Sequence, residues 1–475
     1  MVAIPFPLNS APGKTPHESA GRLINAYWEP LQPGARAERV WRRAPGLRAW
    51  ATTGRTGPRG ALLVGATLYA AFAGGISRFD ATGARTSVGN LAGSAKVFWA
   101  RNLKSPTPDI VVVDPDNGAF AVTPASVASY PDADLPAVNS VCFIDGYFMF
   151  TTGDGRCFAS ALNDTAINPS TFITAEGRPD GLLRAVASAD LYLAGTDSIE
   201  VWHDTAESAP AFPFSRAIVI PKGIIGRYAV SGFENGFDKG IVFVGSDRVV
   251  YVLDGYTPRK TSTADVDRAI GDFIEGGGDA SGIELFPYVV GGHSCVVVQC
   301  AAFTWVLDTD TGTWFERRSY LAPNWRATGA VAAFDKWISG DARTGDLVEI
   351  SEYARDEVGE PLMWTVESAP VSAFPNRLAV TRASFDVAQG VGRADGADPM
   401  QTDPTIAISH SDDGGTTWSV PRVRKLGRQS ESPGPVRVTR SGSTRTQGRR
   451  WRLEVSDPVD VALTGGDMTA EARSA

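Results

Sequence analysis

The chain has 475 residues, which is enough for two or three domains and a sizeable buried core. Its 50 glycines and 31 prolines, beside a hydrophobic fraction of 43%, are typical of a turn-rich all-β protein. The longest apolar run, residues 61–76, is broken by glycines and is too short for a membrane helix, so we expect no membrane insertion.

The net charge of −8 is unevenly distributed along the chain. Residues 1–60 hold nine Lys/Arg against three Asp/Glu, and residues 422–452 hold ten against one. Residues 61–421 carry a net charge of −19, and residues 453–475 carry −4. An acidic central region between two basic segments favours contacts between copies of the chain or with other proteins, and it disfavours a body that grips nucleic acid over its surface.

The first 60 residues are rich in Pro, Gly and Arg and show no strong periodicity. We therefore predict an extended, basic N-terminal arm over residues 1–60 that packs on the body of the protein or on a neighbour. The opening stretch, residues 1–14, has no basic segment, and prolines interrupt its apolar part. No secretory signal is predicted, and synthesis in a cytoplasm is expected.

Pairs of strands joined by tight polar turns recur between residues 61 and 353. In the clearest unit, the apolar stretches 191–194 and 199–202 flank the turn at 195–198, as in a β-hairpin. The units begin at Leu62, Val97, Val141, Leu182, Ile241, Tyr288 and Val331. This spacing is close to the ~40–50 residues of a four-stranded propeller blade. We predict a β-propeller of six or seven blades over residues 61–353; a chain of separate β-sandwiches is the alternative.

Residues 354–475 show a different pattern, with short strands separated by Gly/Asp-rich loops. They are predicted to form a second, sandwich-like β domain. Within it, residues 411–418 read SDDGGTTW and fit the Asp-box, S-x-D-x-G-x-T-W, which sialidases and other propellers repeat. Because its Asp and Ser/Thr side chains bond turn amides, the motif predicts a β-hairpin and says little about activity.

Chemically reactive side chains are not clustered in the sequence. The four cysteines, which lie in predicted strands and are interpreted as buried reduced thiols, are Cys142, Cys157, Cys295 and Cys300. The four isolated histidines are His17, His203, His293 and His410. No catalytic motif is present, so we expect no enzyme activity, no metal and no cofactor. The alternative is a virion-associated glycan hydrolase, suggested by the Asp-box and the propeller repeat.

Two short elements carry the most specific family resemblance. Residues 175–182 read AEGRPDGL and lead into the hairpin at 191–202, and residues 221–226 read PKGIIG. The candidate residues that they contribute are Glu176, Pro179, Asp180, Gly181, Lys222, Gly223 and Gly226. Together with weaker elements such as NAY at 25–27 and RAPGL at 43–47, they resemble the packaged-DNA stabilisation proteins of short-tailed bacteriophages, also called tail hub or nozzle proteins, over nearly the full chain.

The resemblance implies a structural virion protein of the tail, made in the bacterial host cytoplasm. It implies a homo-oligomeric ring, a hexamer, that assembles beneath the portal and its adaptor, extends the channel through which genomic double-stranded DNA passes, and retains the packaged DNA. Tail spikes or fibres and a needle or plug would dock on it. We expect the element at 176–181 to shape a blade junction or an intersubunit contact. The basic interface candidates are Arg422, Arg424, Lys425, Arg449, Arg450 and Arg452. A free-standing propeller that binds host proteins is a third interpretation.

Overall fold

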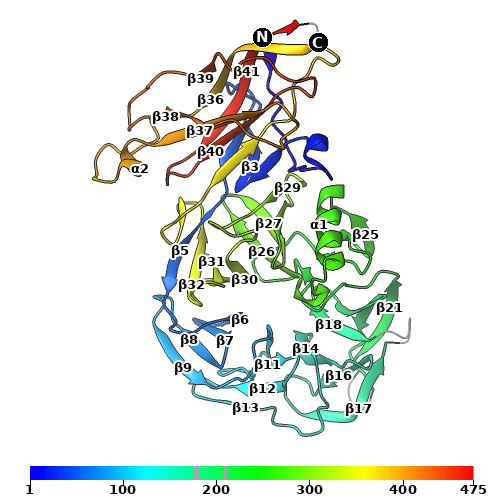
Figure 1. Cartoon of the computed structure of the whole chain (residues 1–475). Helices are drawn as coiled ribbons and strands as arrows, with labels where there is room; N and C mark the ends of the chain where they lie inside the picture. The colour runs from blue at the N-terminus through cyan, green and yellow to red at the C-terminus, as the bar shows by residue number, and fades with distance from the viewer. Residues whose placement is uncertain (176–180, 208–210, 474–475) are drawn as a thin grey trace.

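The protein consists of a ring of small β-sheets and a two-sheet domain at the edge of that ring (Figure 1). The computed structural model describes residues 1–175, 181–207 and 211–473. Almost all of its regular structure is β-strand. Across the described residues, no helix is long and apolar enough to cross a membrane.

The ring is a β-propeller that has seven four-stranded antiparallel blades in the described part of the chain. The six blades built from consecutive strands are, from the inner to the outer strand, blade 1, β6 (Pro58–Val64), β7 (Thr67–Phe72), β8 (Gly75–Phe79) and β9 (Arg85–Gly89); blade 2, β10 (Phe98–Arg101), β11 (Ile110–Asp114), β12 (Gly118–Val122) and β13 (Val127–Ser129); blade 3, β14 (Ser140–Ile144), β15 (Tyr147–Thr151), β16 (Arg156–Ser160) and β17 (Ile167–Thr174); blade 4, β18 (Leu182–Ala187), β19 (Leu191–Gly195), β20 (Ile199–Asp204) and β21 (Phe214–Ile220); blade 5, β22 (Val230–Ser231), β23 (Val242–Val244), β24 (Val250–Asp254) and β25 (Thr257–Lys260); and blade 6, β26 (Glu284–Val290), β27 (His293–Gln299), β28 (Thr304–Asp308) and β29 (Thr313–Glu316). The predicted propeller of six or seven blades is confirmed.

Blade 7 closes the ring with a strand from the other end of the propeller sequence. Its inner strands are β30 (Ala327–Ala333), β31 (Lys336–Asp341) and β32 (Leu347–Ser351), and its fourth strand is β5 (Gly46–Ala51). β5 pairs antiparallel with β32, with Leu47 opposite Ile350. Because β5 runs on into blade 1, hydrogen bonds between strands hold the first and last blades together. The ring therefore starts at residue 46, earlier than the predicted boundary at residue 61.

Apolar side chains on both faces of the blades form the propeller core. In β11, residues Ile110 to Val113 are all buried, because neighbouring blades cover both sides of the sheet. One hydrophobic cluster joins blades 1 and 2 through Ile76 and Val112, and similar clusters lie between other blades. The four cysteines are unpaired and buried, as predicted, and burial raises the pKa of Cys142 to about 12.

The second domain is a sandwich of two β-sheets. One sheet has the order β3-β4-β41-β36-β39, with β1 beside β41, and the other has the order β2-β35-β40-β37-β38. The strands are β1 (Val2–Ala3), β2 (Arg22–Ile24), β3 (Ala26–Pro30), β4 (Arg39–Arg43), β35 (Trp364–Glu367), β36 (Arg377–Val387), β37 (Thr405–Ser411), β38 (Arg422–Lys425), β39 (Val436–Thr439), β40 (Arg450–Val455) and β41 (Ala462–Arg473). The two sheets face each other across a core in which the rings of Phe385 and Trp451 lie 5.5 Å apart.

The N-terminal 60 residues differ from the predicted extended arm. They supply β1 to β4 to the sandwich and β5 to blade 7. Each of these strands is short, and its partners lie hundreds of residues away, so no local periodicity announced them. β2 also pairs in parallel with β29 of blade 6 through Ile24 and Glu316, which makes one nine-stranded sheet that continues from the propeller into the sandwich.

Helices are few and short. The longest, α1 (Ala264–Glu275), lies between blades 5 and 6 and buries Val266 and Ile270. The remaining short elements are the 3₁₀ turns Pro16–Glu18 and Ala280–Gly282, the helix α2 (Pro399–Thr402), and the strands β33 (Asp356–Glu357) and β34 (Glu360–Pro361), which extend the sheet of blade 7 beyond β5.

Candidate assembly residues and the interdomain pocket

The first family element lies at the junction between blades 3 and 4. Glu176, Pro179 and Asp180 fall outside the described residues. Gly181 follows them, directly before β18, and a Cβ atom at this position would lie 2.8 Å from the carbonyl oxygen of Gly153. Gly153 belongs to the turn between β15 and β16, so Gly181 passes close to the backbone of the preceding blade.

The second family element, which includes Lys222, Gly223 and Gly226, joins blades 4 and 5. The amide of Ile224 donates to Gly195 of blade 4 at 2.9 Å, and the amide of Ile225 donates to Val244 of blade 5 at 3.0 Å. A Cβ atom at Gly223 would lie 2.1 Å from the carbonyl carbon and oxygen of Thr196. The loop is therefore wedged between two blades, and its glycines permit the close approach.

Lys222 and Gly226 complete this loop at its two ends. The Lys222 ammonium forms an ion pair with Asp247 at 2.5 Å and lies 5.2 Å from the centre of the Tyr251 ring. A Cβ atom at Gly226 would lie 3.1 Å from the carbonyl oxygen of Ala280, so this glycine also packs against a neighbouring loop. The PKGIIG element thus has a clear role within one chain, in fixing the position of blade 5 beside blade 4.

Arg449 and Arg450, expected at an interface, lie in the interior of the sandwich. The Arg449 side chain is fully buried and binds both carboxylate oxygens of Asp412, at 2.7 and 2.8 Å. Arg450 donates to Glu367 at 2.9 Å and to the carbonyl oxygens of Ser368 and Gly414. Both side chains are consumed by internal bonds, because they satisfy buried acceptors that no other cation reaches.

Arg452 shares this internal network. Its guanidinium bonds Glu367 at 2.7 Å and lies 3.8 Å from the centre of the Trp418 ring, and only a quarter of its side chain is exposed. Trp418 is the last residue of the Asp-box, so Arg452 attaches that turn to β35. The basic run at the end of the chain therefore contributes less surface charge than its sequence indicates.

The Asp-box forms the predicted structural turn. The Asp413 carboxylate accepts hydrogen bonds from the Ser411 hydroxyl at 2.8 Å and from the Thr417 amide at 2.9 Å. Burial opposes ionisation, but these hydrogen bonds outweigh it and lower the pKa of Asp413 to about 2. With its acceptors occupied by turn donors, this carboxylate serves to hold the turn.

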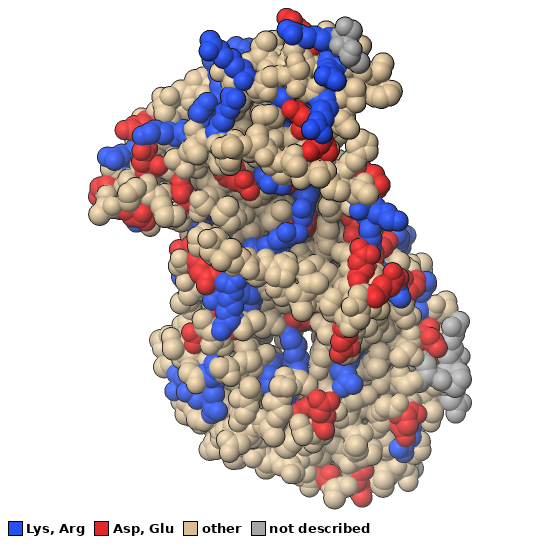
Figure 2. All heavy atoms as spheres, viewed as in Figure 1, with Lys and Arg blue, Asp and Glu red and all other residues tan. Residues whose placement is uncertain are grey.

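Arg422, Arg424 and Lys425 lie on β38, at the edge of the nine-stranded sheet. Arg424 donates to the carbonyl oxygen of Arg437 at 2.8 Å, and Arg422 donates to the carbonyl oxygen of Thr439. These acceptors belong to β39, the edge strand of the facing sheet, so the arginines close the open edge of the sandwich. Lys425 forms an ion pair with Asp403 at 2.6 Å. Figure 2 shows Lys and Arg side chains gathered over the outer part of the sandwich.

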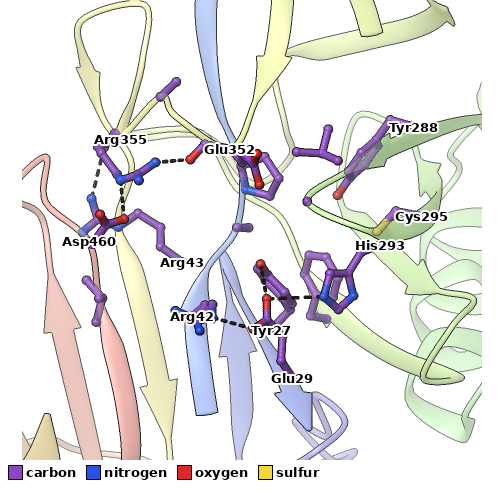
Figure 3. A pocket seen from close by; sticks show the side chains of 17 residues that line it. Tyr27, Glu29, Arg42, Arg43, Tyr288, His293, Cys295, Glu352, Arg355 and Asp460 are labelled. Carbon is purple, nitrogen blue, oxygen red and sulfur yellow. Dashed lines mark hydrogen bonds and ion pairs between the residues drawn. The ribbon is translucent and has the colours of Figure 1, made fainter. Parts of the chain in front are cut away.

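A cavity of about 260 Å³ lies where the sandwich meets blades 6 and 7. Tyr27 and Glu29 of β3 and Arg42 of β4 line it from the sandwich, and Tyr288 and His293 line it from blade 6. Figure 3 shows that these side chains converge on the cavity from both domains. The cavity is therefore part of the joint between the two domains.

A network of charges around Glu29 crosses this joint. Glu29 accepts a hydrogen bond from the Tyr27 hydroxyl at 3.0 Å and forms ion pairs with Arg42 at 2.5 Å and His293 at 3.4 Å (Figure 3). The other ring nitrogen of His293 lies 2.8 Å from Asp308. His293 thus bridges a carboxylate of the sandwich and a carboxylate of its own blade.

The two carboxylates keep His293 charged. Burial disfavours the imidazolium, but Asp308 and Glu29 outweigh it and raise the pKa of His293 to about 9. Burial likewise opposes ionisation of Glu29, yet the hydrogen bonds and charges of His293 and Arg42 lower its pKa to about 2. At neutral pH the joint therefore contains an ion pair between imidazolium and carboxylate.

Stability should depend on the protonation of His293. Because its pKa in the folded protein is raised, its stabilising contribution is complete below the ordinary value near 6.5 and is lost as the pH rises through 9. We expect the free energy of unfolding to fall by about 2 kcal/mol over this window in urea denaturation.

The variant His293→Gln should lack most of this decrease between pH 6.5 and 9. The exposed-histidine variant His17→Gln is the control and should retain it. An unchanged pH profile for His293→Gln would contradict the assignment.

Sequence reasoning missed this joint. His293 was interpreted as isolated because Glu29 lies 264 positions earlier in the chain. Asp308 was interpreted as a solvated turn former; it does accept the amide of Asp310 at 3.0 Å, but its side chain is buried. Its position at the end of a strand beside an apolar run was the available signal.

The structure defines a β-propeller protein with an attached sandwich domain, in which most of the singled-out residues that the structure describes build junctions between blades or between sheets. The family model described as bacteriophage P22 Gp10, β-propeller, a phage stabilisation family, matches residues 23–353. The chain belongs to this family and is therefore a phage structural protein.

Solved structures resemble the chain in part, and no curated protein matches it. The WD40 β-propeller domain of Doa1 is 12% identical, with a TM-score of 0.41, and the match covers 64% of this chain and 96% of that domain. The computationally designed protein Ika8 is 13% identical, with a TM-score of 0.38 over 73% of this chain and 99% of that one. BamB from Moraxella catarrhalis is 11% identical, with a TM-score of 0.37 over 61% and 92%.

Proposed function

We propose that this protein is a subunit of the tail hub, or nozzle, of a short-tailed phage. Copies of the chain form a ring, a hexamer, below the portal and its adaptor. The ring extends the DNA channel, retains the packaged genome, and provides docking sites for tail spikes or fibres and for a needle or plug. Membership of the phage stabilisation family, matched over residues 23–353, supports this proposal.

The observation that carries the proposal is the continuous sheet between the two domains. β2 lies between β29 of the propeller and β35 of the sandwich, and Arg22 of this strand forms an ion pair with Glu316 of blade 6 at 2.6 Å. The side-chain amide of Asn25 donates to the carbonyl oxygens of Arg318 and Met363, on the two sides of the joint. Main-chain and side-chain bonds thus fix the two domains as one rigid unit, which suits a subunit that must hold its place against internal pressure.

The charge of the propeller fits a channel wall. Residues 61–353 hold 34 Asp/Glu against 21 Lys/Arg. A surface of this sign repels phosphate groups, so a duplex in the channel would pass without adhering. The adaptor and the spikes would then be held by contacts between proteins.

Electron microscopy of a reconstituted complex tests the proposal. Purified protein mixed with portal–adaptor complexes of the same phage should add a ring of density below the adaptor. The adaptor-free portal is the control and should gain no such ring. Protein that stays monomeric and never joins the complex would contradict the proposed function.

A further inference from the structure

We propose that the outer edge of the sandwich, formed by β38 and β39, binds the acidic face of blades 3 and 4 of a second copy of this chain. This contact rests on the proposed function, because it would be the contact that repeats around the ring. It requires two surfaces on one chain that differ in position and are complementary in charge and polarity.

The first surface is an arginine edge on the sandwich. It consists of Arg422 and Arg424 of β38 and Arg437 and Arg440 in and beside β39. Within the described ranges, no carboxylate lies within ion-pair distance of any of these four guanidinium groups. Arg422 and Arg424 are bound to carbonyl oxygens, which leaves their positive charge uncompensated.

The arginine edge also exposes apolar side chains. Val423, between Arg422 and Arg424, is 55% exposed, and Val420, just before β38, is 85% exposed. In the described part of the chain, β38 pairs with β37 on one side and with no strand on the other. An unpaired edge that combines uncompensated cations with exposed valines is suited to an acidic protein surface with an apolar centre.

The second surface is a group of aspartates on one face of the propeller. Asp145 lies in the turn between β14 and β15, Asp190 in the turn between β18 and β19, and Asp204 at the end of β20. These positions lie on the same face of blades 3 and 4, because the first and third turns of a blade are on the same side of an antiparallel sheet. Asp190 accepts a hydrogen bond from Tyr256 at 2.8 Å.

The charges of these aspartates are not balanced locally. Among the residues that the structure describes, no Lys or Arg forms an ion pair with Asp145 or Asp204. Burial and the neighbouring carboxylates of Asp204 and Asp190 raise the pKa of Asp145, which reflects mutual repulsion. Blades 3 and 4, residues 140–220, hold ten Asp/Glu against four Lys/Arg.

Two exposed leucines lie beside the aspartates. Leu103 is 66% exposed and Leu162 is 65% exposed. The Leu103 amide donates to the Asn163 side chain at 2.9 Å, so the two leucines are close, and a Cβ atom at Gly146 would lie 2.6 Å from the Leu162 side chain. Asp145 precedes Gly146. The acidic face thus has an apolar centre, as the arginine edge does, and the two surfaces are complementary.

The two surfaces lie at opposite ends of the molecule. β38 is at the upper left of Figure 1, and blades 3 and 4 are at the lower right. A contact between them joins copies head to tail, and repetition of such a contact closes into a ring when the rotation allows it. Because the surfaces are distinct, the contact cannot saturate in an isolated dimer.

Nucleic acid is the other polyanion that an arginine edge could bind. The exposed valines favour a protein surface, since phosphate backbones offer no apolar partner to them. The uncompensated aspartates and leucines of the same chain supply such a surface. We therefore assign the edge to a second copy and treat DNA binding as an outcome that would overturn this assignment.

Reciprocal charge reversal tests the contact. The edge variant is Arg437→Glu with Arg440→Glu, and the face variant is Asp145→Lys with Asp204→Lys; all four residues are exposed. We expect each variant to associate roughly tenfold more weakly than the wild type, because like charges then oppose each other. Association is measured by light scattering of the full chain and by ring formation on portal–adaptor complexes.

Mixing the two variants should restore association, because the edge of one then meets the face of the other with opposite charges. Arg259→Glu, an exposed change on blade 5, is the control and should leave association unchanged. Circular dichroism melting curves for all variants establish that they are folded.

The outcomes separate the contact from the proposed function. Wild-type rings together with unchanged rings from both variants would overturn the contact and leave the hub intact. A wild-type chain that forms no rings on the portal–adaptor complex would overturn both. Duplex DNA binding that is lost in the edge variant while association is unchanged would assign the edge to DNA and overturn the contact.

Discussion

Replacing Gly223 with alanine is expected to destabilise the propeller by about 3 kcal/mol or more. The added methyl group would lie 2.1 Å from the Thr196 carbonyl group, and both partners are backbone atoms that cannot rotate away. Relief requires the loop at 221–226 to move, which breaks the bonds from Ile224 to Gly195 and from Ile225 to Val244. Thermal and urea denaturation of the purified variant measure the loss.

The matched control is Gly282→Ala. A Cβ atom at Gly282 has no neighbour within 4 Å, so this substitution should change the free energy of unfolding by less than about 1 kcal/mol. If Gly223→Ala were as stable as the wild type, the loop would not be fixed between blades 4 and 5 as the structure shows. A loss of similar size in both variants would attribute the effect to glycine in general.

Replacing Arg450 with methionine is expected to cost about 3–5 kcal/mol of stability, because it removes one partner from a buried ion pair. The side chains of Arg450 and Glu367 are each 3% exposed, and their charged atoms are 2.9 Å apart. Arg450 also donates to Ser19, which belongs to the N-terminal segment, and to Gly414 of the Asp-box. The substitution should therefore loosen three separate parts of the sandwich at once.

Arg452→Met is the control for this prediction. It removes a bond to the same carboxylate, but Arg452 is a quarter exposed and Glu367 would keep its bond to Arg450. We expect a smaller loss, of about 1–2 kcal/mol. Limited proteolysis gives a second readout, since Arg450→Met should expose cleavage sites in the sandwich before the propeller. Equal losses for the two variants would contradict the central role of Arg450.

The arginines show why charge counted along a sequence overstates surface charge. Residues 422–452 hold ten Lys/Arg, and the sequence predicted a basic interface there. Arg449 and Arg450 are instead buried against Asp412 and Glu367, which lie 37 and 83 positions earlier. A charge is on the surface or in the interior according to the sheet that covers it, and that sheet is assembled from distant strands.

Local patterns were sufficient for the blades themselves. The unit at 182–202 forms β18, β19 and β20, because its alternation and its polar turn are properties of neighbouring residues. The Asp-box at 411–418 forms its turn for the same reason. Here the hydrogen bonds and the apolar faces involve residues that are close in sequence, and the pattern alone specifies them.

The sequence by itself determined an all-β protein with repeated blades, a second β domain and buried thiols. Tertiary structure alone decided how the ring closes, where residues 1–60 lie, and how the two domains join. β5 pairs with β32 about 300 positions away, and β2 joins β29 to β35. A short strand gains its stability from the strands beside it and from the core that it covers, so its position depends on partners that local periodicity does not record.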